Sequence, residues 1–270
     1  MIKYIFVGIL LLGLMACEKV IDLELNSEQP RLVIEANLFF NKSYGTLSQQ
    51  IQLSLSSSYF ENNFIPARGA EVYVLDSNAK KYSFLEAENG IYYPMELLDF
   101  SYGARYTLSI TYEGEVYEGS EVFLPVNYFS RIEQKNYTLF GNEVVELKAY
   151  SKDEDPKTNY SLFEFLGEDW KIPDYTLYRD DFIESDEFYG IHISDDIEAG
   201  DEIRIRLFSI SERFYQYMTL LIQQSFNQGG PFQAQVANLT GNCVNLTRPE
   251  HYPLGYFRIS EVAEVFYTVE

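Results

Sequence analysis

The sequence predicts a mainly β protein with an N-terminal immunoglobulin-like β-sandwich, followed by a second β-rich domain that carries one amphipathic helix. Three observations lead to this prediction. Apolar and polar residues alternate with a period of two through much of the chain. In the first half, short strand-like runs follow one another with no helical pattern between them. One segment near residues 210–226 changes to helical spacing.

The first 16 residues have the pattern of a secretory signal peptide. Lys3 provides the positive charge, an apolar run follows, and Ala16 is the small residue at its end. The run is shorter than the roughly 20 residues that a membrane-spanning helix needs. The segment from Leu14 to Cys17 resembles a bacterial lipobox, which predicts that Cys17 carries a lipid anchor. A plain secretory signal followed by an incidental cysteine is the alternative.

Residues 17–30 are predicted to form a lipidated acidic tether. Glu18, Asp22 and Glu24 are scattered along it. Acidic residues after a lipidated cysteine resemble surface-export signals, and the spacing here leaves open whether the protein is displayed on the cell surface or on the periplasmic face.

Residues 31–125 are predicted to form the sandwich. Each of its strand-like runs places apolar residues on one face, as half-buried strands require. The pair Glu113-Gly114 lies between two runs and predicts a hairpin turn. Pro125 marks the predicted end of this domain. The alternating apolar positions are Leu32, Ile34, Ala36 and Leu38; Ile51, Leu53 and Leu55; Ala70, Val72 and Val74; and Tyr106, Leu108, Ile110 and Tyr112.

Residues 126–270 are predicted to form the second β-rich domain. Alternation at Ile203, Ile205 and Leu207 is typical of a strand. The segment from Ser209 onward instead places Phe214, Tyr217, Met218 and Leu221 on one helical face, which we expect to pack on a sheet. Ser209 and Glu212 have the spacing of a capping box at the start of this helix.

The composition indicates a folded, acidic protein. Aromatic residues make up 16% of the chain, too many for a disordered segment. The net charge of −21 excludes nucleic acid as a partner, because phosphates would be repelled. Apart from Cys17, the one cysteine is Cys243, which we expect to be a small buried residue.

Sequence motifs for catalysis are absent, and we predict that the protein is not an enzyme and needs no cofactor. The chain has no nucleophile elbow, no zinc-binding His-Glu-x-x-His and no phosphate-binding glycine loop. Its two histidines, His192 and His251, lie far apart in sequence and are expected to be structural or solvent-facing. Paired carboxylates could serve a glycosidase, but 41 acidic residues make chance pairs unavoidable.

Two acidic clusters offer calcium as an alternative to an absence of metal. Calcium takes six to eight oxygen ligands, and acidic loops can supply them. Neither cluster has the spacing of an EF-hand, and Asp is favoured in turns for local backbone reasons, so solvated turns are the favoured interpretation. The candidate ligands are Asp153, Asp155, Asp195, Asp196 and Asp201.

Aromatic residues are the candidates for ligand binding. Trp170, Tyr175 and Tyr178 lie in stretches that read as loops. Aromatic rings on loops of a β-sandwich can stack on sugars or anchor a protein partner. The alternative is that they pack against the core, since aromatic residues are ordinary in strands.

A set of short motifs, in this order and spacing, resembles one family over nearly the whole chain. That family is the Bacteroidota lipoprotein family known as domain of unknown function 4249. The motifs are Cys17 to Asp22, Pro66 to Ala70, Asp153 to Pro156 with Asn159-Tyr160, Gly200-Asp201, Phe214 to Tyr217, Gln223-Gln224, Gly241-Asn242 and Leu254 to Phe257.

The resemblance implies an envelope lipoprotein whose first domain is immunoglobulin-like. Genes of the family often lie beside those of TonB-dependent outer-membrane receptors. It therefore implies a lipid-anchored, non-enzymatic outer-membrane protein that is accessory to a TonB-dependent β-barrel or an envelope complex, in a binding or scaffold role. A surface structural or adhesion protein is one alternative. A hydrolase with an unrecognised carboxylate site is another.

Overall fold

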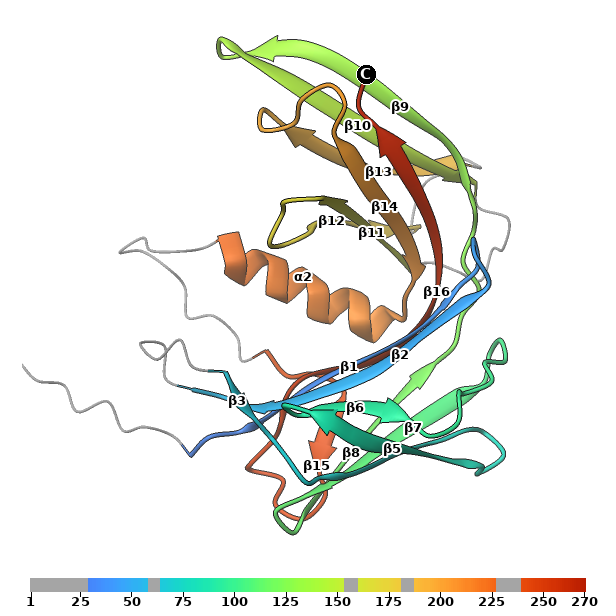
Figure 1. The fold of residues 1–270 in the computed structure, drawn as a ribbon, viewed down its shortest axis with the longest axis vertical. Coiled ribbons are helices and arrows are strands. Elements are labelled where there is room, and N and C mark those ends of the chain that lie inside the picture. The colour runs from blue at the N-terminus through green and yellow to red at the C-terminus, as the bar shows by residue number, and fades with distance from the viewer. Residues whose placement is uncertain (1–28, 58–63, 153–159, 181–186, 227–238) are drawn as a thin grey trace, which may run out of the picture.

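The computed structural model describes residues 29–57, 64–152, 160–180, 187–226 and 239–270. The predicted signal peptide and Cys17 lie outside these ranges. Within them the chain is mainly β with one helix, as the sequence predicted (Figure 1). The strands of the first half are β1 (Leu32–Asn41), β2 (Thr46–Leu55), β3 (Ile65–Pro66), β4 (Glu71–Leu75), β5 (Lys81–Glu88), β6 (Ile91–Pro94), β7 (Arg105–Tyr112) and β8 (Glu115–Val122).

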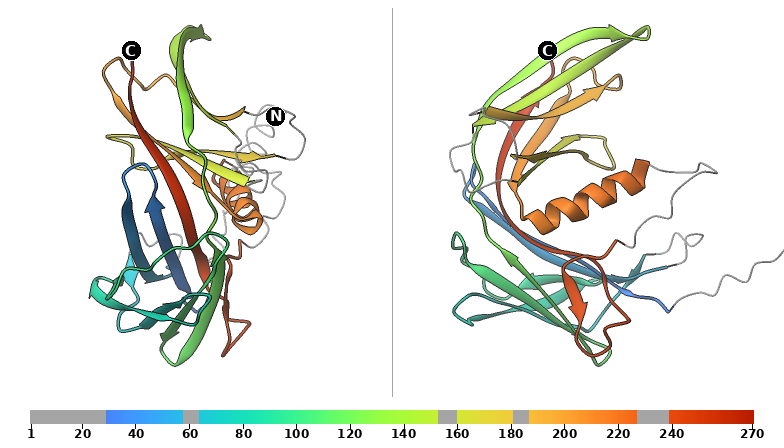
Figure 2. Two further views of the ribbon diagram at one scale, coloured as in Figure 1. Left: turned by 90° about the vertical axis from the view of Figure 1, so that its right-hand side faces the viewer. Right: turned by 180° about the vertical axis from the view of Figure 1, so that it is seen from behind.

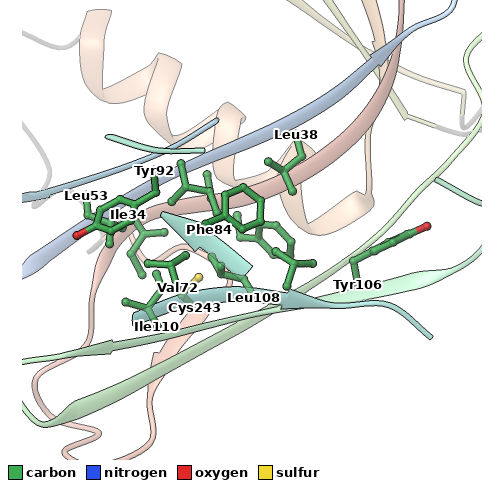
Figure 3. Packing of buried hydrophobic residues seen from close by; sticks show 14 of the residues in the cluster. Ile34, Leu38, Leu53, Val72, Phe84, Tyr92, Tyr106, Leu108, Ile110 and Cys243 are labelled. Carbon is green, nitrogen blue, oxygen red and sulfur yellow. The ribbon is translucent and has the colours of Figure 1, made fainter. Parts of the chain in front are cut away.

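The first half is a two-layered β-sandwich. Strands β1, β2 and β6 form one layer, strands β5, β4, β7 and β8 form the other, and the β5–β6 hairpin joins them. Seven antiparallel strands in two layers of three and four are the arrangement of an immunoglobulin-like sandwich. Figure 3 shows the side chains that fill the space between the layers, among them Ile34, Val72 and Leu108.

The alternation in the sequence correctly predicts which residues face this core. Leu32, Ile34, Ala36 and Leu38 are all buried, whereas Glu35 between them is exposed. A strand with one buried face must repeat every second residue, so the pattern is a direct record of burial. The predicted hairpin turn is confirmed too, because Glu113 and Gly114 join β7 to β8 with φ angles of 49° and 79°.

The second half adds two further layers. Strands β11 (Tyr160–Gly167), β12 (Asp174–Arg179) and β14 (Glu202–Ser209) continue the main sheet beyond β16 (Leu254–Thr268). A separate sheet of β9 (Phe129–Leu139), β10 (Asn142–Lys152) and β13 (Glu187–Ser194) packs on one face of that extension. Their shared core contains Leu147, Ala149, Phe163, Phe165, Ile203, Ile205 and Leu207.

Strand β16 connects the two halves. Its first part pairs in parallel with β1, from Val33–Leu254 to Asn41–Val262, and its second part pairs with β14. The nearby strand β15 (Cys243–Asn245) pairs with β8. The sheet therefore runs across the boundary predicted at residue 125, and residues near the C-terminus complete the first sandwich. Local alternation in the sequence does not indicate the pairing of β1 with β16, because these strands lie about 220 residues apart.

The helix α2 (Glu212–Phe226) lies where the sequence predicted it, inside the concave face of the curved sheet (Figures 1 and 2). Its predicted cap is wrong by two residues. Ser211, and not Ser209, accepts a hydrogen bond at its Oγ from the backbone N–H of Phe214, over 3.2 Å. Ser209 is still part of β14, and its hydroxyl donates to the carbonyl of Leu124.

Candidate functional site

The inner face of α2 presents a stripe of large side chains to the sheet. Phe214 and Met218 are buried, and Tyr217 and Leu221 are partly buried beside them. Their spacing of three and four residues places them on one side of the helix. This face, predicted from the sequence as core, packs on β11, β16 and the end of β1 and also forms one wall of a cavity.

The opposite wall is the concave face of the sheet. Because side chains alternate along a strand, the residues of β1 that do not enter the sandwich core point toward α2. These include Val33, Glu35 and Asn37. On β16 the matching residues are Tyr256 and Arg258, and Arg258 lies directly beside Asn37 in the register of the two strands.

Between these walls lies a cavity of about 590 Å³. Pockets for small molecules have volumes of roughly 300–1,000 Å³ and are lined mainly by apolar and aromatic side chains. This lining fits that description, because Glu35, Asn37 and Arg258 are its polar members apart from the tyrosines. The other residues that line it are Val33, Leu162, Tyr175, Phe214, Tyr217, Met218, Leu221, Leu239, Tyr252, Leu254, Gly255 and Tyr256.

Arg258 is the unusual member of this lining. Its side chain is only 9% exposed, and the guanidinium lies 4.4 Å, 4.6 Å and 4.9 Å from the ring centres of Phe39, Phe208 and Phe214. Burial lowers the pKa of Arg258 to about 10. Within the described ranges it has no hydrogen-bond or ion-pair partner, and its Nε atom is buried without one.

The nearest buried carboxylate on this face is already neutralised. Glu164 accepts a hydrogen bond from Nε of Arg206 over 2.7 Å, and Arg204 lies 3.9 Å away. Glu164 therefore attracts Arg258 without forming an ion pair with it. The positive charge of Arg258 faces the cavity unpaired, because Glu164 already lies beside two other arginines, Arg204 and Arg206.

A buried hydrogen-bond network holds Tyr256, one of the residues that line the cavity. Tyr256 donates its hydroxyl to Oε2 of Glu121 over 3.1 Å, and the capping residue Ser211 donates to the same oxygen over 2.9 Å. Burial raises the pKa of Glu121 and that of Tyr256. The start of α2 and one aromatic wall are thus held by a single side chain of β8.

The model of a family described as "Domain of unknown function (DUF4249)" matches residues 18–265. The chain belongs to this family. The family predicted from the short motifs is thereby confirmed. Comparison with curated proteins gives no match. Among solved structures, this DUF4249 chain is similar to a segment of chicken tenascin with two fibronectin type-III domains, at 10% identity and a TM-score of 0.23, covering 68% of this chain and 92% of that one.

Of the three aromatic residues predicted to bind a ligand, one lines the cavity of this DUF4249 chain. Tyr175 faces α2 from β12. Tyr178 packs on Phe188 with ring centres 4.3 Å apart, at the edge of the second core. Trp170 packs at the same core, against Gly167.

The prediction that Tyr175 and Tyr178 lie in a loop is wrong. Both belong to β12, where alternation sends Tyr175 to the helix side and Tyr178 to the other face. The strand is short, and Pro173 just before it makes the segment read as a loop. Arg258 carries no comparable signal, although an arginine between Phe257 and Ile259 in an otherwise apolar run marks an unusual position.

The described calcium candidates do not form a metal-binding site. Asp153 and Asp155 lie outside the described residues. Asp195, Asp196 and Asp201 are exposed in the loop between β13 and β14, where Asp201 accepts a hydrogen bond from the backbone N–H of Glu198. Within the described ranges, no group of three or more acidic, histidine or cysteine side chains is placed to hold a metal ion.

The two histidines lie in different parts of the DUF4249 fold. His192 is buried, with Nδ1 2.6 Å from a carboxylate oxygen of Asp174 and its ring 4.8 Å from that of Trp170. His251 lies beside Glu115, with Nδ1 3.2 Å from the carboxylate. Each makes local structural contacts.

Glu115 is the centre of a polar cluster at the end of the first sandwich. Burial raises its pKa, but hydrogen bonds from Tyr117, His251 and Asn245 and the charge of Arg248 outweigh that effect, so the pKa is lowered to about 2. A hollow of about 370 Å³ adjoins the cluster. Since Arg248 lies 2.6 Å from Glu115, the charges there are already paired.

A larger hollow, of about 670 Å³, lies between the β9–β10 hairpin and the loop after β13. Its charged lining is acidic, with Glu143, Asp195 and Glu198 among the carboxylates. In contrast to the cavity beneath α2, its charged groups are all of one sign. In the part of the chain that the structure describes, no helix is long and apolar enough to cross a membrane.

Proposed function

We propose that this chain is a non-enzymatic binding protein, anchored by lipid at Cys17 to the outer membrane and accessory to a TonB-dependent uptake or envelope complex. The observation that carries the binding role is the cavity beneath α2, which has the size and lining of a small-molecule site. The lipobox pattern supports the anchor, and the family resemblance supports the link to a transporter.

The construction of the cavity favours binding. Its walls come from a helix and from paired strands, and Glu121 holds both Tyr256 and the start of the helix, so the space is formed in advance of any ligand. A site built on rigid elements loses little entropy when it is filled. Of the described residues that line it, Glu35 is the one carboxylate, whereas hydrolysis by the alternative carboxylate mechanism requires two.

The proposed anchor would keep the cavity near the membrane. The twelve residues from Cys17 to Glu28 can span at most about 40 Å when fully extended. The first described residues lead directly into β1, whose Val33 already lines the cavity. A captured molecule would then be held within reach of a β-barrel in the same membrane.

Affinity purification tests the transporter link. The chain, tagged after Glu270, is isolated from detergent-solubilised outer membranes, and co-purifying proteins are identified by mass spectrometry. We expect a TonB-dependent β-barrel in the wild-type sample. Absence of any β-barrel at reproducible abundance would refute the accessory role.

The two cysteines provide a matched control for the anchor. Cys17→Ser is expected to abolish incorporation of labelled palmitate and to release the protein from the membrane fraction. Cys243→Ser changes the other thiol and is expected to leave both unchanged. Membrane retention of the Cys17→Ser variant would contradict the anchoring.

One observation favours the second candidate, a surface structural or adhesion protein. Phe140, at the tip of the β9–β10 hairpin, is fully exposed, and Leu139 and Ile193 beside it are also exposed. An apolar tip of this kind can seat in a partner. Loss of cell aggregation in a Phe140→Ser strain, with β-barrel association unchanged, would favour adhesion over the transporter link.

A further inference from the structure

We propose that the cavity beneath α2 takes an amphipathic monoanion, a molecule with an aromatic or otherwise apolar body and one carboxylate or similar group, and that the anionic group pairs with Arg258. This inference rests on the proposed binding function and names the class of ligand for that site.

The argument begins with the isolation of Arg258. Charged side chains in protein interiors are normally paired, because an unpaired buried charge is costly. Arg258 is nine-tenths buried, lines the cavity and has no ion-pair partner in the described part of the chain. The aromatic rings around it stabilise a cation but cannot accept a hydrogen bond from all of its N–H groups. Its unused donors are therefore available to a ligand.

The donors of Arg258 match a planar oxyanion. A guanidinium presents its N–H groups as a fork that fits two oxygens of a carboxylate. Asn37 lies directly beside Arg258 on the neighbouring strand, lines the same cavity, and can add a side-chain amide donor. A carboxylate or sulfonate could thus pair with the charge of Arg258 and accept hydrogen bonds from Arg258 and Asn37.

The remaining walls restrict the rest of the ligand. They are aromatic or aliphatic. Phe214 and Tyr217 belong to α2, and Tyr175 faces the helix from β12. Burial raises the pKa of Tyr175 and Tyr217, so both hydroxyls are neutral at physiological pH and do not repel an anion. An apolar body would be buried against these rings, which favours binding through the hydrophobic effect.

The charges nearby restrict the ligand to a single negative group. Glu35 also lines the cavity and is exposed, so a second anionic group on the ligand would meet like charge. The chain as a whole carries −21, which disfavours polyanions further. Among the described residues that line the cavity, Arg258 is the one positive charge, and the cavity therefore selects a monoanion with an apolar body.

A matched pair of fluorescent probes tests the inference. The first is 8-anilinonaphthalene-1-sulfonate, and the second is N-phenyl-1-naphthylamine, which has the same ring system without the sulfonate. Both are titrated into the full chain carrying Cys17→Ser, so that no acyl group binds them. Arg258→Gln removes the charge, and Arg68→Gln removes an exposed charge from the loop between β3 and β4 as the control.

We expect the sulfonate to bind wild-type protein and the Arg68→Gln variant equally. We expect Arg258→Gln to weaken its binding about 10- to 100-fold, as loss of a charged hydrogen-bond donor implies. The neutral probe should bind all three proteins alike. Excess 1-naphthoate should displace the sulfonate from wild-type protein.

Other results would overturn either the role of Arg258 or the binding function of the cavity. If both probes bind and Arg258→Gln changes neither, the cavity binds apolar molecules and the role of Arg258 is wrong. If neither probe binds wild-type protein, the cavity is not a binding site, and the proposed binding function fails together with the inference. The same conclusion follows if Leu221→Trp, which fills the cavity, gives a folded protein with unchanged binding of the sulfonate. Thermal unfolding of every variant shows that the proteins compared are folded.

Discussion

Replacement of Arg258 by methionine is expected to stabilise the protein. Burial lowers the pKa of Arg258 from 12.5 to about 10, and each pKa unit corresponds to 1.36 kcal/mol, so the buried charge costs about 3 kcal/mol. Attraction to the three surrounding rings, at about 0.5–1 kcal/mol for each ring, returns about 1.5–3 kcal/mol of this in total. Methionine keeps the contacts with those rings and carries no charge. The net gain is therefore up to about 1.5 kcal/mol in the free energy of unfolding.

Thermal unfolding followed by circular dichroism at pH 7 measures this effect. For a chain of this size a gain of about 1.5 kcal/mol raises Tm by about 3–6 °C. Arg206→Met is the control on the same face of the sheet. Because it leaves the buried Glu164 without its closest partner, it should destabilise the protein by about 3 kcal/mol. A lower Tm for Arg258→Met would show that Arg258 serves the fold, and the reasoning on its unpaired charge would be refuted.

Three further predictions concern other parts of the fold. In urea unfolding, Gly255→Ala should destabilise the protein by about 3 kcal/mol or more, because Gly255 has φ +84° and a Cβ there would overlap the neighbouring strand. The control is Gly45→Ala, which should cost only about 1 kcal/mol, because Gly45 has φ +66° but lies in open space. The pKa of Glu115 is lowered to about 2, so this residue contributes stability that is present above the ordinary carboxyl pKa of 4.5 and is lost as pH falls from about 4.5 toward 2. In a plot of the urea midpoint against pH, Glu115→Gln should therefore flatten the curve over that range. An unchanged curve would exclude this role of Glu115. Burial raises the pKa of Cys243 to about 12, so in the Cys17→Ser variant it should not react with a thiol reagent at pH 8 until urea unfolds the chain, and rapid labelling of the native protein would contradict its burial.

The sequence predicts the first sandwich well because its strands have one buried face each. Ile34 and Leu38 repeat at the interval that burial imposes, and Glu113-Gly114 provides the two positive φ angles that the hairpin needs. The helix is equally visible, since Phe214 and Met218 fall on one helical face. These features depend on neighbours within a few residues, and a local pattern records them.

The cavity depends on contacts that no local pattern records. Arg258 belongs to β16, which is covered on both faces over much of its length, so its sequence does not alternate. The arginine between Phe257 and Ile259 is unusual in sequence, but it indicates no cavity until β16 is known to pair with β1 and to lie beneath α2. Tyr175 was accessible from sequence as an aromatic candidate, but the strand that directs it toward α2 was not.

The late position of β16 in the chain has a consequence for biogenesis. Leu254 of β16 follows its partner Val33 of β1 by about 220 residues, so this pairing cannot form until nearly the whole chain has reached the compartment where it folds. Because β16 also contributes to the second core, through Ala263, a chain that ends early lacks a shared part of both cores. The fold therefore distinguishes complete chains from truncated ones, and proteases that act on unfolded protein would remove the latter.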